Sequence, residues 1–342
     1  AMTAAQRLSP LSIVLDAPSD MHSTSNGVDY IIITHADFYD EVLPLENRRT
    51  TQGLRTMVVD VQDVYDEFSY GIFDAPAIHD FLAYAYAHWQ PPAPSYVLLV
   101  GDGNFDFKDN LGTGEANYIP PYLAMVDFNM LGETAADNRY VTVSGDDILP
   151  DMHIGRLPVQ TSAQASTMVN KILDYEQNPP SGDWNKDVLF VADDQDSAGD
   201  FDALSDDIAD NYLPSSYTAQ KVYYKITHTT VSAVRTAIVN AINEGRLLTN
   251  YIGHAAVNFW AQEQLFRVAD LASLTNSDKL PMVLPMTCQE GYFIWPGFPC
   301  FGESVVCAEG KGAIASWSPT GWGLALGHHY LNQGFFTAVF TD

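Results

Sequence analysis

The chain has 342 residues, of which 46% are hydrophobic and 12% aromatic, and this is enough for two hydrophobic cores in an α/β arrangement. Sixteen Lys and Arg against 43 Asp and Glu give a net charge of −27, which argues against nucleic acid or an anionic membrane as a partner. No run of 18 or more apolar residues is present, so we expect no membrane contact. The many Asp and few Lys and Cys favour a secreted or cell-surface protein.

The first half of the chain predicts strands that alternate with helices. Residues 1–28 are polar and indicate an N-terminal arm. The expected strands are 29–34, 54–61, 96–100 and 152–157, and the expected helices are 38–52, 75–89 and 163–176. Residues 104–149 are irregular and rich in Gly, Asp and Tyr. Near-continuous apolar strands between helices are typical of a parallel sheet covered on both faces.

The motif QNPPSGDW interrupts this pattern and indicates a boundary between a subdomain of residues 29–178 and a second of residues 185–342. Strands are then expected at 188–192, 221–226, 247–252, 282–286 and 312–317. Helices are expected at 201–212, 231–243, 268–274 and 301–309, and from 324 onward. The sequence therefore predicts two adjacent α/β subdomains, each with a mainly parallel sheet flanked by helices.

Two strand ends in the second half carry reactive side chains. The segment LLTNYIGHAAVNFW breaks at Gly253 and presents His254, and LPMVLPMTCQEGYF presents Cys288 just past an apolar strand. Function collects outside the carboxyl ends of strands in open α/β sheets, so Cys288 and His254 are a candidate nucleophile and base. Cys300 and Cys307 are interpreted as small core residues.

Several segments together resemble the gingipain-type cysteine peptidases, which are relatives of the caspases. The motifs that carry the resemblance are YVLLVGD, HIGRLPV, KILDYE, NYIGHAAVNFW, LTNSDKLPMVLPMTCQEGYF, PCFGE and KGAIASWSPTGWG. The resemblance implies a caspase-like fold and an endopeptidase in which Cys288 attacks and His254 transfers the proton. It also implies an oxyanion hole formed by the N–H groups of Cys288 and Ala255. No cofactor is expected for catalysis.

The resemblance places further roles in the loop DDQDSAGDFD. An acidic side chain just after the strand 188–192 would orient His254; Asp193 and Asp194 both fit, and Asp194 is preferred. An Asp at the start of the next helix, Asp200 or Asp202, would pair with an Arg or Lys side chain of the substrate. Asp193 and Asp194 could instead belong to a solvated acidic loop or bind calcium, and Asp200 or Asp202 could be an ordinary helix cap.

An aromatic side chain and a metal complete the expected site. The resemblance matches Trp322 to an aromatic residue of the substrate pocket. Asp102, Asn104 and Asp106 alternate as oxygen ligands do, so a structural calcium ion is expected, although the spacing is not that of an EF-hand and its ligands stay unknown.

The expected partner is a protein or peptide substrate. Two alternatives to hydrolysis after basic residues stay open at this point. One is a transpeptidase or maturation enzyme that passes the thioester to an amine, and the other is a non-catalytic surface adhesion module.

Overall fold

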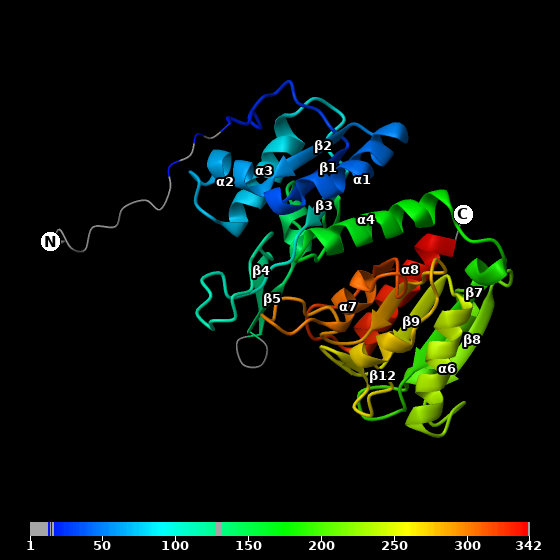
Figure 1. The fold of residues 1–342 in the computed structure, drawn as a ribbon. Helices are drawn as coiled ribbons and strands as arrows, with labels where there is room; N and C mark the ends of the chain where they lie inside the picture. The colour runs from blue at the N-terminus through cyan, green and yellow to red at the C-terminus, as the bar shows by residue number, and fades with distance from the viewer. Residues whose placement is uncertain (1–12, 14, 16, 128–131, 341–342) are drawn as a thin grey trace.

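The computed structural model describes residues 13, 15, 17–127 and 132–340, and its first half is built on a parallel sheet with the strand order β2-β1-β3-β6 (Figure 1). The strands are β1 (Tyr30–Thr34), β2 (Thr56–Asp60), β3 (Tyr96–Val100) and β6 (His153–Leu157). They pair in parallel and in register, as the apolar runs predict. The centre of β1 is fully buried, which satisfies the expectation of a sheet covered on both faces.

The second half contains another parallel sheet, with the order β14-β13-β9-β7-β8. Its strands are β7 (Asp187–Ala192), β8 (Thr218–Tyr223), β9 (Leu248–Ile252), β13 (Met282–Met286) and β14 (Ala315–Ser316). The prediction for residues 221–226 was wrong by three residues, because the chain after Tyr223 turns back at Lys225, which has a φ of 62°. The strand expected at 312–317 is reduced to two residues at the sheet edge.

Helices cover both sheets. They are α1 (Tyr39–Thr51), α2 (Val61–Phe68), α3 (Ala75–His88), α4 (Ser162–Gln177), α5 (Phe201–Asn211), α6 (Val231–Glu244), α7 (Phe301–Cys307) and α8 (Ala325–Phe340). Short 3-10 helices occupy Ala36–Phe38, Asp137–Val141, Asp183–Lys186 and Val268–Ser273. Sequence analysis missed α2, whose first turn is capped by the carboxylate of Asp60. The helix expected at 268–274 is a 3-10 helix.

Two small antiparallel sheets were not predicted. One pairs β4 (Leu123–Asp127) with β5 (Gly132–Ala135) inside the segment expected to be irregular. The other joins β10 (Ala255–Ala256), β11 (Phe259–Trp260) and β12 (Phe266–Arg267) directly after His254. Most residues of the predicted arm, 1–12, 14 and 16, lie outside the described residues.

The two sheets share a hydrophobic cluster, because α4 runs between the halves of the molecule (Figure 1). Met168 of α4 belongs to the same cluster as Leu98 of the first sheet and Leu189 of the second. The ammonium group of Lys171 on α4 donates hydrogen bonds to three main-chain carbonyls at the C-terminal end of α7 and just beyond it. The halves are therefore packed as one body. Within the described residues, no helix has the length and apolar character needed to cross a membrane.

Candidate active site

The strands that carry the two reactive side chains are neighbours. β9 and β13 pair in parallel with Ile252 opposite Met286, so His254 and Cys288 each lie two residues beyond matched strand ends. The buried side chain of Asn250 on β9 donates to the carbonyl of Leu284 on β13, which helps to fix this register. Parallel strands present their carboxyl ends at one edge of the sheet, and this explains why the two loops meet.

His254 and Cys288 line one pocket with a volume of about 430 Å³. The lining residues are His254, Ala255, Cys288, Gln289, Trp322, Gly323 and Leu324. The structure therefore brings together four of the residues singled out in the sequence, Cys288, His254, Ala255 and Trp322. Within the described residues, this lining contains no carboxylate.

The imidazole of His254 contacts a carboxylate that sequence analysis did not choose. Its Nε2 lies 3.0 Å from Oδ2 of Asp196, and both side chains are about half exposed. The edge of the Phe201 ring packs against the imidazole with the ring centroids 5.3 Å apart. The backbone N–H of Ala198, followed by the imidazole, lowers the pKa of Asp196, so this residue stays ionised at neutral pH.

Asp194, which we expected at this position, is engaged elsewhere. Its Oδ2 accepts a hydrogen bond of 2.7 Å from Lys225, and the ion pair holds the carboxylate at the end of β8. Asp193 instead supports the main chain of the His254 loop, because its Oδ2 accepts from the His254 N–H at 3.3 Å. Burial raises the pKa of Asp193 to about 6. The structure therefore replaces Asp194 by Asp196 as the side chain in contact with the imidazole.

The N–H groups of Ala255 and Cys288, which are expected to form an oxyanion hole, lie in loops that main-chain hydrogen bonds hold in place. Ala261 N donates to His254 O at 2.6 Å, and Ala255 pairs with Trp260. In an antiparallel ladder this makes Ala255 and Trp260 a non-hydrogen-bonded pair, so the Ala255 N–H points away from β11. The residue after Cys288, Gln289, has a φ of 54° and donates its N–H to Gly321 O.

Asp200 and Asp202 lie beside the pocket without lining it. Oδ1 of Asp200 accepts from Ala203 N, so this exposed residue is the N-cap of α5. Asp202 is half-buried, and burial, followed by the charge of Asp200, raises its pKa. Both flank Phe201, the residue that packs on the His254 imidazole.

The expected calcium ligands do not converge. Asp106 accepts from the N–H groups of Asn110 and Leu111 and so stabilises its own loop. Oδ1 of Asn104 accepts from Asp106 N. Asp102 and Asn104 both line a separate pocket, whereas Asp106 does not.

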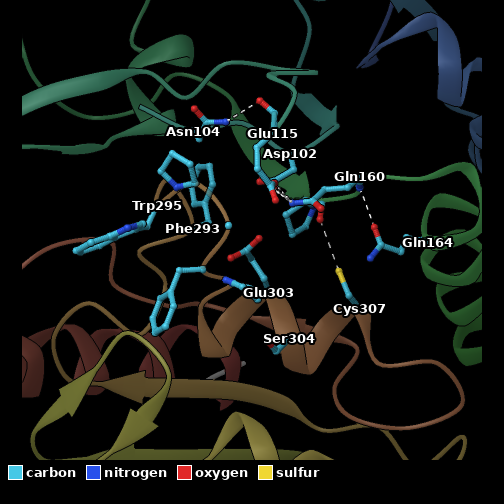
Figure 2. A pocket seen from close by; sticks show the side chains of 15 residues that line it. Asp102, Asn104, Glu115, Gln160, Gln164, Phe293, Trp295, Glu303, Ser304 and Cys307 are labelled. Carbon is cyan, nitrogen blue, oxygen red and sulfur yellow. Dashed lines mark hydrogen bonds between the residues drawn. The ribbon is translucent and has the colours of Figure 1, made fainter. Parts of the chain in front are cut away.

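That separate pocket has a volume of about 270 Å³ and carries several acidic side chains. Figure 2 shows Asp102, Glu115 and Glu303 around it, and the side-chain N–H of Gln160 donates to both Asp102 and Glu115. Burial raises the pKa of Asp102, and it raises the pKa of Glu303 to about 8. The charge of Asp102 raises the pKa of Glu303 further, because the two carboxyl groups lie close enough to repel each other.

A further acidic group lies near the active site. Carboxylate oxygens of Asp193, Asp194 and Glu263 lie within 4.8 Å of one another. Lys225 already neutralises part of this charge, because it is paired with Asp194.

A sequence model of peptidase family C25 matches residues 23–342. The chain belongs to peptidase family C25. Gingipain R2 of Porphyromonas gingivalis strain W83 is 26% identical to it over 293 residues, which cover 85% of this chain and 35% of that protein. Lys-gingipain W83 of the same organism is 27% identical over 220 residues, or 61% of this chain and 12% of that protein. This member of the family therefore spans about a third of the length of the first relative.

Two solved structures of a family member show the same fold. The complex of the RgpB pro- and mature domains of P. gingivalis superposes with a TM-score of 0.75 at 22% identity and covers 92% of this chain and 69% of that one. The crystal structure of the Arg-specific cysteine proteinase gingipain R gives 0.73 at 22% identity, with 95% and 69% coverage. The prediction of a caspase-like α/β fold is confirmed.

Proposed function

We propose that this C25 family member is a cysteine endopeptidase in which Cys288 is the nucleophile and His254 the general base and acid. The observation that carries this proposal is the pairing of the two side chains in one pocket at matched strand ends. Cys288 is free and half-buried, so a substrate can reach its sulfur. The other two cysteines are poorer nucleophiles, because burial raises the pKa of Cys307 to about 12 and that of Cys300 well above its ordinary value.

The reaction follows from the contacts of each group. The Cys288 thiolate attacks the carbonyl carbon of the scissile bond, and the N–H groups of Cys288 and Ala255 receive the charge on the carbonyl oxygen. The carbon–nitrogen bond then breaks, and His254 gives its proton to the leaving amine. Water, deprotonated by His254, attacks the thioester carbon and releases the thiol. With Nε2 held by Asp196, Nδ1 is the nitrogen left to exchange the proton.

Cleavage after Arg or Lys is the specificity we propose. The similar proteins include an Arg-specific cysteine proteinase and a Lys-gingipain, and the charge of −27 attracts cationic substrates. In this chain Asp200 and Asp202 are the carboxylates next to Phe201, which contacts His254. A guanidinium group that reaches them would sit at the edge of the pocket, with Trp322 available to cover its alkyl stem.

A structural calcium ion is also proposed, at the pocket of Figure 2. Its donors would be the carboxylates of Asp102, Glu115 and Glu303, which are the hard oxygen ligands that calcium prefers, and the Gln160 amide N–H now bridges the first two. The fit rests on two buried acids that repel each other, because a divalent cation would relieve that repulsion. Calcium would then tie the first half of the chain to α7. A secreted or cell-surface location, where calcium is abundant, is part of the same proposal.

The test of the peptidase compares Cys288→Ala with Cys307→Ala on a library of peptides that differ at the residue before the cleaved bond. We expect Cys288→Ala to lose hydrolysis by about 10⁴-fold or more and Cys307→Ala to keep it. Peptides with Arg or Lys at that position should be cleaved and those with Asp or Glu should not. Turnover by a folded Cys288→Ala protein would refute the mechanism. Mass spectrometry of the products with an added amine distinguishes hydrolysis from transpeptidation.

The test of the calcium site uses thermal unfolding. Calcium should raise the Tm of the wild-type chain and EDTA should lower it, while Glu303→Gln should reduce both effects. A Glu263→Gln variant is the matched control, because Glu263 belongs to the other acidic group. Calcium stabilisation lost only in the control would move the site to that group.

A further inference from the structure

A fully buried carboxyl group lies two residues beyond the proposed nucleophile. Glu290 has 0% exposure, and both of its carboxyl oxygens lack a hydrogen-bond partner among the described residues. An acidic side chain is almost never buried in this way unless it is paired. Neither the chemistry proposed above nor the lining of the catalytic pocket uses this residue.

The neighbours of Glu290 come from different loops of the active site. The indole N–H of Trp260 and the hydroxyl of Ser318 face its carboxyl group closely enough to lower its pKa, although burial outweighs them. Trp260 belongs to the β10–β11 hairpin that follows His254. Ser318 lies in the segment between β14 and α8, which also carries Trp322. Glu290 therefore lies where the three loops that form the catalytic pocket meet.

Main-chain contacts tie the same loops together around this carboxyl group. Gly291 N donates to Pro319 O, and Gly302 N donates to the carbonyl oxygen of Glu290 itself. A Cβ atom on Gly291 would lie 2.7 Å from Cβ of Ser318, so these two segments are in closest contact. A change at Glu290 is therefore transmitted directly to the loop that carries Cys288.

Trp260 extends this connection to the other catalytic residue. Its ring stacks on Tyr251 with the centroids 4.5 Å apart, and the Tyr251 hydroxyl donates to the carbonyl of His254 at 2.5 Å. A displacement of Trp260 would thus displace the main chain of His254.

The neutral acid is the form of Glu290 that this environment favours. The titratable group that interacts with it is the thiol of Cys300 at the start of α7, which is itself neutral, and Glu303 lies beyond that thiol. No Lys, Arg or His is among the described groups that shift the pKa of Glu290. Burial raises this pKa to about 7, so the group changes its charge near neutral pH.

We propose that Glu290 is a positioning residue whose protonated carboxyl group holds the three loops together, so that Cys288 and His254 meet, and whose ionisation loosens them. A neutral carboxyl group can donate one hydrogen bond and accept another at this junction, whereas a carboxylate brings an unpaired charge to a fully buried position. The inference rests on the proposed peptidase function, because it concerns the geometry of that site. Glu290 acts through the loops and touches no substrate.

The experiment measures kcat, KM and kcat/KM between about pH 5 and pH 9 for the wild-type chain, Glu290→Gln and Glu309→Gln. The kcat of the wild-type chain should fall on the alkaline side and reach about a tenth of its plateau near pH 8. At that pH a group with a pKa of about 7 is about one-tenth protonated. Glu290→Gln, which is neutral at every pH, should stay within about threefold of the wild-type value at pH 6 and lose this fall. The fall should appear in kcat rather than KM.

Glu309→Gln is the matched control. It removes a carboxylate from an exposed residue just after α7 and should keep the wild-type profile. An alkaline fall of equal size in Glu290→Gln would overturn the inference. A folded Glu290→Gln protein that is inactive at pH 6 would overturn it as well, since the neutral form would then not be sufficient.

Ser318→Ala covers the case in which Glu290→Gln does not fold. The Ser318 hydroxyl lowers the pKa of Glu290, so its removal should move the alkaline fall to higher pH, and an unchanged position would count against the inference. The rate of Cys288 alkylation by iodoacetamide, taken as the ratio of variant to wild type at each pH, gives a second readout. If no peptide is cleaved by any variant, the peptidase proposal fails, while a pH-dependent ratio would still support the role of Glu290.

Discussion

Replacing Asp196 by Ala should reduce kcat/KM modestly, and replacing Asp194 by Ala should leave it nearly unchanged. Asp196 lies 3.0 Å from Nε2 of His254, whereas Asp194 is paired with Lys225 at 2.7 Å. The side chains of His254 and Asp196 are 47% and 46% exposed, so solvent screens their attraction. An exposed ion pair of this kind contributes about 0.2 to 1 kcal/mol. If all of it serves the transition state, the loss corresponds to about 1.4- to fivefold.

The assay is hydrolysis of one Arg-containing peptide by the two variants at about pH 7, at low ionic strength and again in about 0.5 M NaCl. Asp196 is ionised at this pH, because its pKa is lowered by the Ala198 N–H and then by the imidazole. Salt should shrink the difference between wild type and Asp196→Ala, since the Debye length falls well below 10 Å. The reasoning fails if Asp194→Ala loses more activity than Asp196→Ala, or if the loss in Asp196→Ala approaches 100-fold.

Three further predictions concern the catalytic pair, the loop before it and stability. His254→Ala should lose turnover about as completely as Cys288→Ala, and the double variant should be little worse in a steady-state assay. Gly253→Ala should lower the free energy of unfolding by about 1 to 3 kcal/mol in urea titrations, because Gly253 has a φ of 154° and an added Cβ would lie 2.4 Å from Cβ of Asp193. The free energy of unfolding should fall as pH rises from about 4.5 to about 7, since Glu290 binds its proton more tightly in the folded chain than in the unfolded chain. Glu290→Gln has no carboxyl group to ionise, so above pH 7 its free energy of unfolding should exceed that of the wild type by up to ~3 kcal/mol.

The strands and the main catalytic pair could be predicted because their signals are local. An apolar run ended by Gly253, or followed by Cys288, shows where a strand stops, and parallel pairing then brings the two ends together. The small sheet β10–β12 could not be seen in the same way. Its strands are two residues long, and antiparallel contacts between loops decide its position.

Which aspartate contacts His254 depends on the conformation of one loop, and the sequence analysis weighed only Asp193 and Asp194. The sequence DDQDSAGDFD places several carboxylates within reach of a strand end. Asp196 N donates to Gly199 O, and this turn directs the Asp196 side chain toward the imidazole. Lys225, which captures Asp194, comes from the end of another strand. The distant lysine, invisible to local spacing, therefore decides which aspartate is available.

Glu290 shows the opposite difficulty, because its environment and not its position makes it informative. In the motif TCQEGYF it resembles any glutamate of a surface turn, and such residues are mostly exposed. Only the meeting of three loops buries it completely. The signal available in the sequence was its distance of two residues from Cys288.

The last prediction concerns how much specificity the acidic residues of α5 can supply. The catalytic pocket has no carboxylate among its described lining residues, and Asp200 is exposed at the helix cap. An Arg side chain of the substrate would therefore pair with a solvated carboxylate, which contributes about 1 kcal/mol or less. Asp200→Asn should raise KM for an Arg peptide by at most about fivefold, and salt should reduce the effect. Asp202→Asn should cost more, because Asp202 is half-buried and its raised pKa shows a desolvated group that a guanidinium would neutralise. Equal and salt-independent losses above 100-fold in both variants would mean that substrate binding reshapes the start of α5 into a closed pocket.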